Sequence, residues 1–137
     1  MSKKIGILTY YWPPAGGSGV QRWLRFSNEL AKLGHDIHVF TFKNPKYPIM
    51  DNELIKKVDS KIKVNFISGF ELPNFLTNKK FNSAESIESS YVKSFVRELF
   101  FFPDSRKFLI SPSTKYIKKY IEKTPLSCLI TSGPPHS

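Results

Sequence analysis

The sequence is poor in residues that cross-link chains or hold metals. Its single cysteine, Cys128, makes an internal disulfide impossible, and its three histidines show no spacing typical of a metal site. Cys128 lies in the apolar run 126–130, which predicts a buried, unreactive thiol. A lone thiol fits a reducing compartment, so we expect a cytoplasmic protein without bound metal.

Other signatures are missing as well. No apolar stretch approaches the ~20 residues that a membrane-spanning helix needs. The chain has no P-loop, no nucleophile elbow and no paired-carboxylate signature. A dinucleotide fingerprint is also incomplete: Arg22 occupies the third glycine position, and Phe42 and Lys43 stand where an acidic residue would hold a ribose. These absences disfavour an NAD enzyme and exclude a P-loop nucleotide-binding protein.

Acidic residues are scarce relative to basic ones. The chain has 11 Asp and Glu against 21 Lys and Arg, a net charge of +10, which favours anionic partners such as nucleotides, phospholipid head groups or nucleic acid. The basic residues are dispersed rather than gathered in a tail. With 137 residues, of which 40% are hydrophobic, the chain has room for one ordered domain and one core.

Apolar periodicity predicts alternating strands and helices. The almost wholly apolar run 4–10 is typical of a central parallel strand. A helix over 20–33, capped by Gly34 in the left-handed conformation, and a strand over 36–42 complete a βαβ unit. Further expected elements are a short helix within 48–59, a strand over 62–67, helices over 91–102 and 113–123, and a strand over 126–131. The order predicts an α/β fold: a Rossmann-like, doubly wound parallel sheet with the first strand between the second and the fourth.

Finer predictions concern the last third of the chain. The fourth strand is expected to be central, and because a doubly wound sheet would cover it with a further helix, the domain looks truncated. The residues of helix 113–123 expected to face inward are Tyr116, Ile117, Tyr120 and Ile121.

Two loops are expected beyond the carboxyl ends of the strands, where open parallel sheets bind ligands. The loop 11–19 carries Gly16, Gly17 and Gly19, which let the backbone approach an anion, while a helix N-terminus favours phosphate. The alternative is a tight turn in which the glycines serve backbone shape only. The second loop places His136 where it could hydrogen-bond a sugar or phosphate, with a loop histidine of no function as the alternative.

Three stretches together resemble the family-four glycosyltransferases. Residues 7–22, continuing through 28–36 to 39–41, carry an aromatic residue, two prolines, paired glycines, an arginine and a helix ending in Leu-Gly-His. The segments Phe-Pro-Asp-Ser-Arg at 102–106 and Leu-Ile-Thr-Ser-Gly-Pro-Pro-His-Ser at 129–137 are similar to two later parts of the same domain.

The resemblance implies that residues 1–137 are the N-terminal, acceptor-side half of a GT-B fold in a retaining (group 1) sugar transferase. It implies a nucleotide-sugar donor, a glycan or lipid-linked acceptor, no cofactor or essential metal, and a role in cell-surface polysaccharide synthesis. The enzyme would be cytoplasmic or peripheral on the inner face of the membrane. The donor-binding C-terminal domain, with the family's two glutamates, has no counterpart here, so this chain alone is expected to be inactive.

The implied site residues follow from position in the matching stretches. Gly16, Gly17, Ser18 and Gly19 would bind the donor phosphates, His136 would act near the transferred sugar, and Trp12, Arg22, Arg106 and Gly133 are candidates for cleft or acceptor contacts. In the complete enzyme, a bulky β-branched residue at Gly17 is expected to weaken donor use and, if the loop is exposed, to leave folding largely intact. The alternatives are a basic nucleic-acid-binding module and a noncatalytic nucleotide-phosphate-binding domain.

Overall fold

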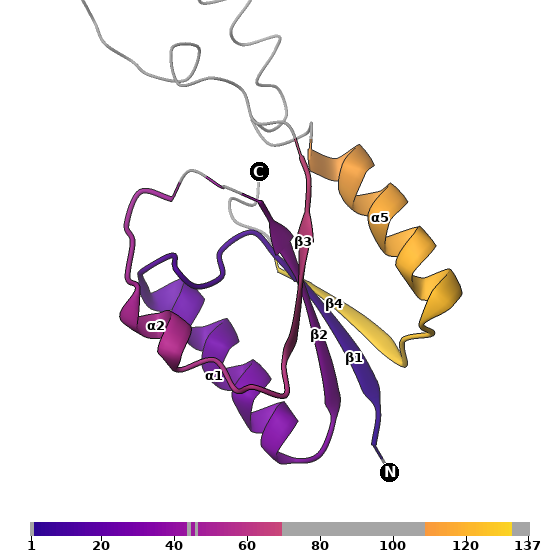
Figure 1. Ribbon diagram of the computed structural model, residues 1–137, viewed down its shortest axis with the longest axis horizontal. Helices are drawn as coiled ribbons and strands as arrows, with labels where there is room; N and C mark the ends of the chain where they lie inside the picture. The colour runs from indigo at the N-terminus through magenta and orange to yellow at the C-terminus, as the bar shows by residue number, and fades with distance from the viewer. Residues whose placement is uncertain (1, 44, 46, 70–108, 133–137) are drawn as a thin grey trace, which may run out of the picture.

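The structure, a computed structural model, is a parallel sheet with helices on both sides, described for residues 2–43, 45, 47–69 and 109–132. The strands β1 (Lys4–Thr9), β2 (Asp36–Phe42), β3 (Lys63–Ile67) and β4 (Cys128–Ser132) form one four-stranded sheet in the order β3-β2-β1-β4. Helices α1 (Ser18–Lys32) and α2 (Glu53–Lys56) lie on one side and α5 (Ile110–Lys123) on the other (Figure 1). The predicted α/β fold and the position of β1 between β2 and β4 are confirmed.

The two helical layers are built on the alternation of side chains along the strands. On one face of the sheet the strand residues Ile5, Ile7, Ile37 and Val39 pack with Val20, Leu24 and Ala31 of α1 and Leu54 of α2. On the other face Phe40, Phe42 and Ile67 pack with Leu109 and Ile117 of the α5 layer. A strand that is covered by helices on both faces can be apolar throughout. This apolar pattern is the one from which β1 was predicted to be central.

Helix α1 begins and ends at glycines with positive φ. Gly17, just before its first residue, has φ 102°, and Gly34, two residues after its last, has φ 87°. The amide of Gly34 donates to the carbonyl of Ala31, and the amide of His35 donates to that of Leu30, which satisfies the last carbonyls of the helix. The predicted cap at Gly34 is therefore confirmed. No helix in the described part of the chain has the length and apolarity to cross a membrane.

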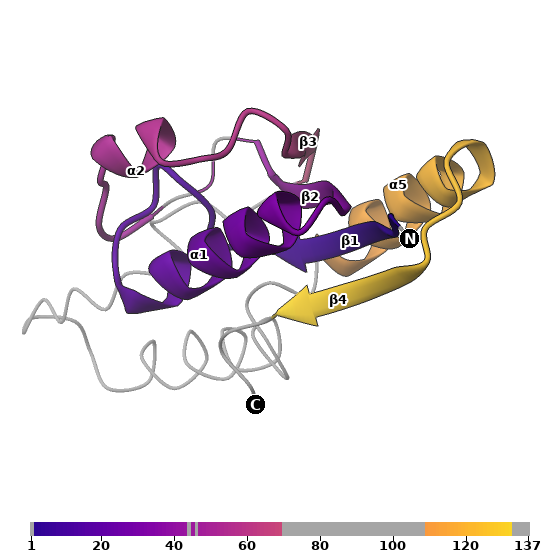
Figure 2. The ribbon, with the colours of Figure 1, turned by 90° about the horizontal axis from the view of Figure 1, so that it is seen from below.

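The finer predictions for the last third of the chain are partly wrong. In the described sheet β4 is an edge strand beside β1 (Figure 2), and Cys128 is exposed. An edge strand is not covered as a central one is, so its apolar run did not mean burial. On α5, Ile117 is buried, whereas Tyr116 and Ile121 are each 37% exposed because they lie at the margins of the packed face. The expected helix within 48–59 is reduced to four-residue α2, and the helix over 91–102 lies outside the described residues.

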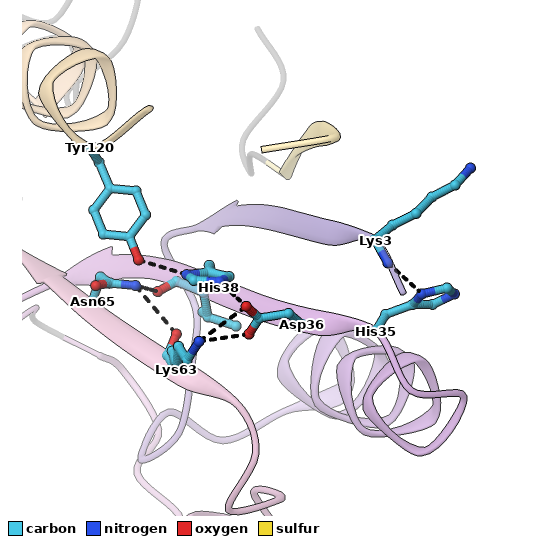
Figure 3. A network of polar contacts seen from close by, with 8 residues as sticks. Lys3, His35, Asp36, His38, Lys63, Asn65 and Tyr120 are labelled. Carbon is cyan, nitrogen blue, oxygen red and sulfur yellow. Dashed lines mark hydrogen bonds and ion pairs between the residues drawn. The ribbon is translucent and has the colours of Figure 1, made fainter. Parts of the chain in front are cut away.

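A polar network holds α5 to the amino-terminal end of the sheet (Figure 3). The imidazole of His38 is 2% exposed, and its Nδ1 lies 2.6 Å from the hydroxyl of Tyr120 on α5. Its Nε2 lies 3.0 Å from Oδ2 of Asp36, in an alignment short of a hydrogen bond. Nζ of Lys63 on β3 donates to Oδ2 of Asp36 at 3.1 Å and lies 2.9 Å from its Oδ1 as an ion pair. Through Asp36, His38 thus joins the strands β2 and β3 to α5.

The carboxyl group of Asp36 is held in its charged form by this network. Burial alone would raise its pKa, but the hydrogen bond and charge of Lys63, together with the close approach of His38, outweigh that effect and place the pKa below the ordinary 3.8. A carboxyl group with a lowered pKa in the folded state stabilises the fold above its unfolded pKa. This contribution is lost as the pH falls through the folded pKa.

We expect Asp36→Asn to lower the free energy of unfolding by about 1 kcal/mol at pH 7 and to make it less sensitive to acid below about pH 4. Urea unfolding of both proteins between pH 7 and pH 2 measures this, with Glu53→Gln as control because the Glu53 and Lys56 side chains are 71% and 74% exposed. Equal acid sensitivity of Asp36→Asn and the parent chain would contradict the assignment.

Candidate functional site

The strands that carry the two predicted loops end side by side. In the register of β1 and β4, Thr9 lies opposite Ser132, so the segments after both strands leave the sheet at the same edge. The adjacency and parallel direction of these strands are confirmed. Gly133, His136 and Arg106 lie outside the described residues, and the proximity of His136 to Gly16 and Gly17 remains a prediction.

We call residues 10–17 the glycine loop and residues 47–51 the neighbouring segment, which follows β2. The two are joined mainly through backbone atoms. The amide of Gly16 donates to the carbonyl of Ile49 at 2.9 Å, and the amide of Asp51 donates to that of Pro14 at 2.7 Å. Between these bonds Ala15 and Met50 form an antiparallel bridge. At the start of the loop, the hydroxyl of Tyr47 donates to the carbonyl of Tyr10 at 2.9 Å. The loop is therefore fixed along its length.

The structural constraint that requires glycine differs among positions 16, 17 and 19. A Cβ at Gly16 would lie 2.8 Å from Cγ2 of Ile49, so this position is closed by packing. Gly17 has open space around it but adopts φ 102° and ψ 169°, a region essentially restricted to glycine. Gly19 has neither constraint, because it lies in the first turn of α1 with a negative φ and nothing within 4 Å of a Cβ. Packing thus explains Gly16 and backbone conformation explains Gly17, but neither explains Gly19.

The amino-terminal end of α1 is exposed and uncapped. Gly17, Ser18 and Gly19 are exposed, no described side chain caps the helix, and its first turn has no acidic residue. First-turn amides lack partners within a helix, and the helix dipole gives this end a partial positive charge. Arg22 is exposed one turn further on, and helical side chains lean toward the N-terminus of their helix. This end of α1 therefore offers donors and positive charge to an anion.

Trp12 does not have the position expected of an acceptor contact. Its side chain is 2% exposed and packs in the cluster that includes Ile7 and Val20. The chain folds back under the glycine loop at this point, through a turn in which the amide of Ala15 donates to the carbonyl of Trp12. Trp12 is a core residue that supports the loop from below, and its contact with a ligand remains a prediction.

A groove of about 270 Å³ runs between α1 and α2, away from the glycines. Its lining includes Arg25, Asn28, Glu29 and Lys57. The amide of Asn28 donates to the carbonyl of Lys57 and its oxygen accepts from the amide of Asp59, while Glu29 pairs with Lys32 at 2.7 Å. Asn28 therefore attaches the chain at the end of α2 to α1, and Glu29 is paired within α1.

Ile49 and Met50, which the fold places against the glycine loop, were not predicted from the sequence. The only sequence feature that could have indicated them is that two large apolar residues stand together between β2 and α2, in a stretch without periodicity. Their role depended on a contact with residues more than 30 positions earlier in the chain, at Ala15 and Gly16.

Comparison with known proteins does not identify a family for this chain. A scan against protein-family models and a search of curated proteins found no match to this chain. Within the described ranges, no three His, Cys, Asp or Glu side chains are grouped as a metal site would require.

Gly17 and Gly19 are expected to respond in opposite ways to substitution by alanine. Gly17→Ala should lower the free energy of unfolding by about 1–3 kcal/mol because of its backbone conformation. Gly19→Ala should leave it unchanged or raise it by up to about 1 kcal/mol, since alanine favours a helix. This corrects the expectation that Gly17 can be replaced without cost to folding.

Thermal and urea unfolding of the two variants would measure the difference, with Gly34→Ala as a second glycine of positive φ, at 87°. Equal stability of the Gly17 and Gly19 variants would contradict the geometry described for the start of α1.

Proposed function

We propose that this chain is the N-terminal, acceptor-side domain of a retaining family-four glycosyltransferase of GT-B fold. The complete enzyme transfers a sugar from a nucleotide-sugar donor to a glycan or lipid-linked acceptor in cell-surface polysaccharide synthesis. The observation that carries the proposal is the bare, uncapped N-terminus of α1, which lies at the sheet edge where β1 and β4 end together. The resemblance of residues 7–22 and 129–137 to this family supports it.

The end of α1 suits the charge that develops during sugar transfer. As the glycosidic bond to the donor breaks, the nucleoside diphosphate leaves with additional negative charge. Backbone amides held in position by the glycine loop stabilise that charge without reorganising, and Arg22 adds a full positive charge nearby. Gly19 finds its explanation here, because the absence of a side chain leaves the amides of the first turn open to a bulky phosphate group.

The remaining parts of the proposed mechanism come from the resemblance. His136 follows β4 by four residues and is assigned to the neighbourhood of the transferred sugar. The family's two glutamates belong to a second domain, so this chain alone is expected to be inactive. No cofactor or metal is required, because the amides and cations of the protein stabilise the leaving group.

The proposed location is the cytoplasm or the inner face of the membrane. Four lysines of α5 are exposed: Lys115, Lys118, Lys119 and Lys123. Basic residues close to an anionic membrane surface contribute about 1 kcal/mol each. This attraction would hold the domain where lipid-linked acceptors are found.

Binding of a nucleoside diphosphate to this chain tests the anion site directly. We expect uridine diphosphate to shift the amide resonances of Ser18 and Gly19 in a saturable manner. Arg22→Gln should weaken binding by about two- to fivefold, corresponding to an exposed ion pair of up to ~1 kcal/mol. Arg25→Gln is the matched control, because both arginines are exposed on α1 and neither forms an ion pair within the described residues.

A different pattern would favour the nucleic-acid alternative. Binding of a random oligonucleotide that weakens steeply with salt, without response of Ser18 or Gly19 to uridine diphosphate, would overturn the proposed function.

In the complete enzyme, His136→Ala is expected to lower kcat more than it raises KM for the donor. A contact that strengthens as charge redistributes contributes more to the transition state than to the ground state. Steady-state kinetics with varied donor concentration measures both constants. Parent values of kcat and KM in His136→Ala would remove this residue from the site.

A further inference from the structure

Helix α1 carries a second row of large apolar side chains beside the row that packs on the sheet. The buried residues of the helix are Val20, Leu24, Ser27 and Ala31. Residues that follow one another at intervals of three and four positions lie along one face of a helix. By this spacing a second row runs along the flank of α1. We call it the apolar stripe, and its members are Trp23, Phe26, Leu30 and Leu33.

The apolar stripe is supported on one side and stands in solvent on the other. Trp23 and Leu30 are half-buried and pack against the same cluster as Ile130 of β4. Phe26 contacts Trp23 edge-on, with ring centroids 5.8 Å apart, and is nevertheless 44% exposed. Leu33 directly follows the last residue of α1 and is 73% exposed. Single exposed apolar residues are ordinary, whereas a row of four at this spacing is the surface that one helix offers to another.

The apolar stripe lies on the flank of α1 that faces away from α2. Asn28, which bonds to the chain after α2, is about half a helical turn from the stripe. Figure 2 shows α2 on one side of α1 and β4 on the other, and no helix of the described residues lies over α1 on the β4 side. A partner therefore has access to the stripe.

The sizes of the side chains on this flank are complementary to themselves about Phe26. Gly19 lies seven residues before Phe26, and Leu33 lies seven residues after it. A Cβ at Gly19 would have nothing within 4 Å, so this position leaves an open space on the helix surface. A two-fold axis pairs each residue before the axis with one after it. Two antiparallel copies of α1 that meet at Phe26 therefore fit Leu33 of one copy into the space over Gly19 of the other.

The charges beside the apolar stripe match in the same register. Arg22 lies four residues before Phe26 and Glu29 lies three residues after it, and both are exposed on the border of the stripe. In the antiparallel pair, Arg22 of each copy meets Glu29 of the other, which gives two ion pairs. Oε1 of Glu29 accepts a hydrogen bond from Lys32 within α1, and a carboxylate has a second oxygen to offer an arginine.

We propose that this flank of α1 binds α1 of a second copy of the chain, antiparallel and related by a two-fold axis at Phe26. The interaction goes beyond the proposed function and does not depend on it. A second copy is the occupant that requires α1 to be complementary to itself in both size and charge. An anionic membrane surface suits the stripe less well, because Glu29 on its border would be repelled by the head groups.

The length of α1 limits the strength of this contact. The helix has 15 residues and is about 22 Å long. One such helix pair buries less than the roughly 800 Å² on each partner that a standard interface needs. Two chains of net charge +10 also repel each other, although about 0.15 M salt screens much of this repulsion. The dimer is therefore weak, with a dissociation constant of about 10 µM to 1 mM.

The dimer and the proposed anion site both use Arg22. A bound phosphate and Glu29 of the second copy compete for its guanidinium, so self-association is measured without nucleotide or phosphate. Its outcome then depends on the contact between copies alone. Leu33 of the second copy approaches Gly19 from the flank of α1, whereas the first-turn amides point along the helix axis.

Sedimentation equilibrium of the 137-residue chain between 10 µM and 1 mM, in about 0.15 M salt, tests for the dimer. We expect Phe26→Gln to weaken association about tenfold or more, because the two copies of this side chain meet at the axis. Ile55→Gln is the matched control, since Ile55 is 50% exposed on α2, away from the stripe. Circular dichroism checks that both variants keep their helices.

A charge exchange tests the register of the two helices. Arg22→Glu and Glu29→Arg should each weaken self-association about five- to thirtyfold, because each turns two ion pairs into two like-charge pairs. An equimolar mixture of the two variants should associate within about threefold of the parent affinity, because both ion pairs are restored in the mixed dimer. A merely structural role of these residues would not produce recovery on mixing.

Four results would overturn the inference. They are a chain that stays monomeric up to 1 mM, a dimer that Phe26→Gln leaves unchanged, a mixture of the charge variants that associates no better than either variant alone, and a monomer that binds phosphatidylglycerol vesicles through Phe26. The last result would assign the stripe to a membrane surface. None of them bears on the response of Ser18 and Gly19 to uridine diphosphate, by which the proposed function is tested separately.

Discussion

The parallel pairing of β1 with two neighbouring strands is the constraint on which the candidate site depends. Leu8 pairs with Phe40 of β2, and Thr9 pairs with Ser132 of β4, so three strands end at one edge of the sheet. The chain must return from the end of β1 to the start of β2, which places the first turn of α1 at that edge. A shift of one residue in either pairing would turn every side chain of the strand to the other face, which the two apolar clusters oppose.

The features that depend on neighbouring residues in the sequence were predictable. The apolar run of β1 indicated a central strand, and Gly34 followed a periodic helix at the position of a left-handed cap. The glycine-rich turn before α1 was also placed correctly. Its physical explanation was not accessible, because the packing reason at Gly16 comes from Ile49, 33 positions later in the chain.

Burial was predictable only where the covering segment could be foreseen. Trp12 precedes two prolines and reads as an exposed loop residue, yet the turn to Ala15 carries its ring into the core. Cys128 lies in an apolar run, yet it belongs to an edge strand of the described sheet and is exposed. Ile121 keeps helical spacing with Ile117, but α5 rotates it to the margin of the contact with the sheet. In each case the deciding contact is set by the tertiary fold and leaves no local pattern.

The contact between Gly16 and Ile49 also constrains how this sequence can change over time. A Cβ at position 16 would come within 2.8 Å of Cγ2 of Ile49, and a β-branched side chain has few rotamers in which to move aside. Side-chain volume at the two positions must therefore be exchanged and not simply added. Among descendants of this sequence, alanine at position 16 should occur together with a residue smaller than isoleucine at position 49. The contact between the glycine loop and the neighbouring segment would then be detectable as covariation of positions 16 and 49 in an alignment of sequences.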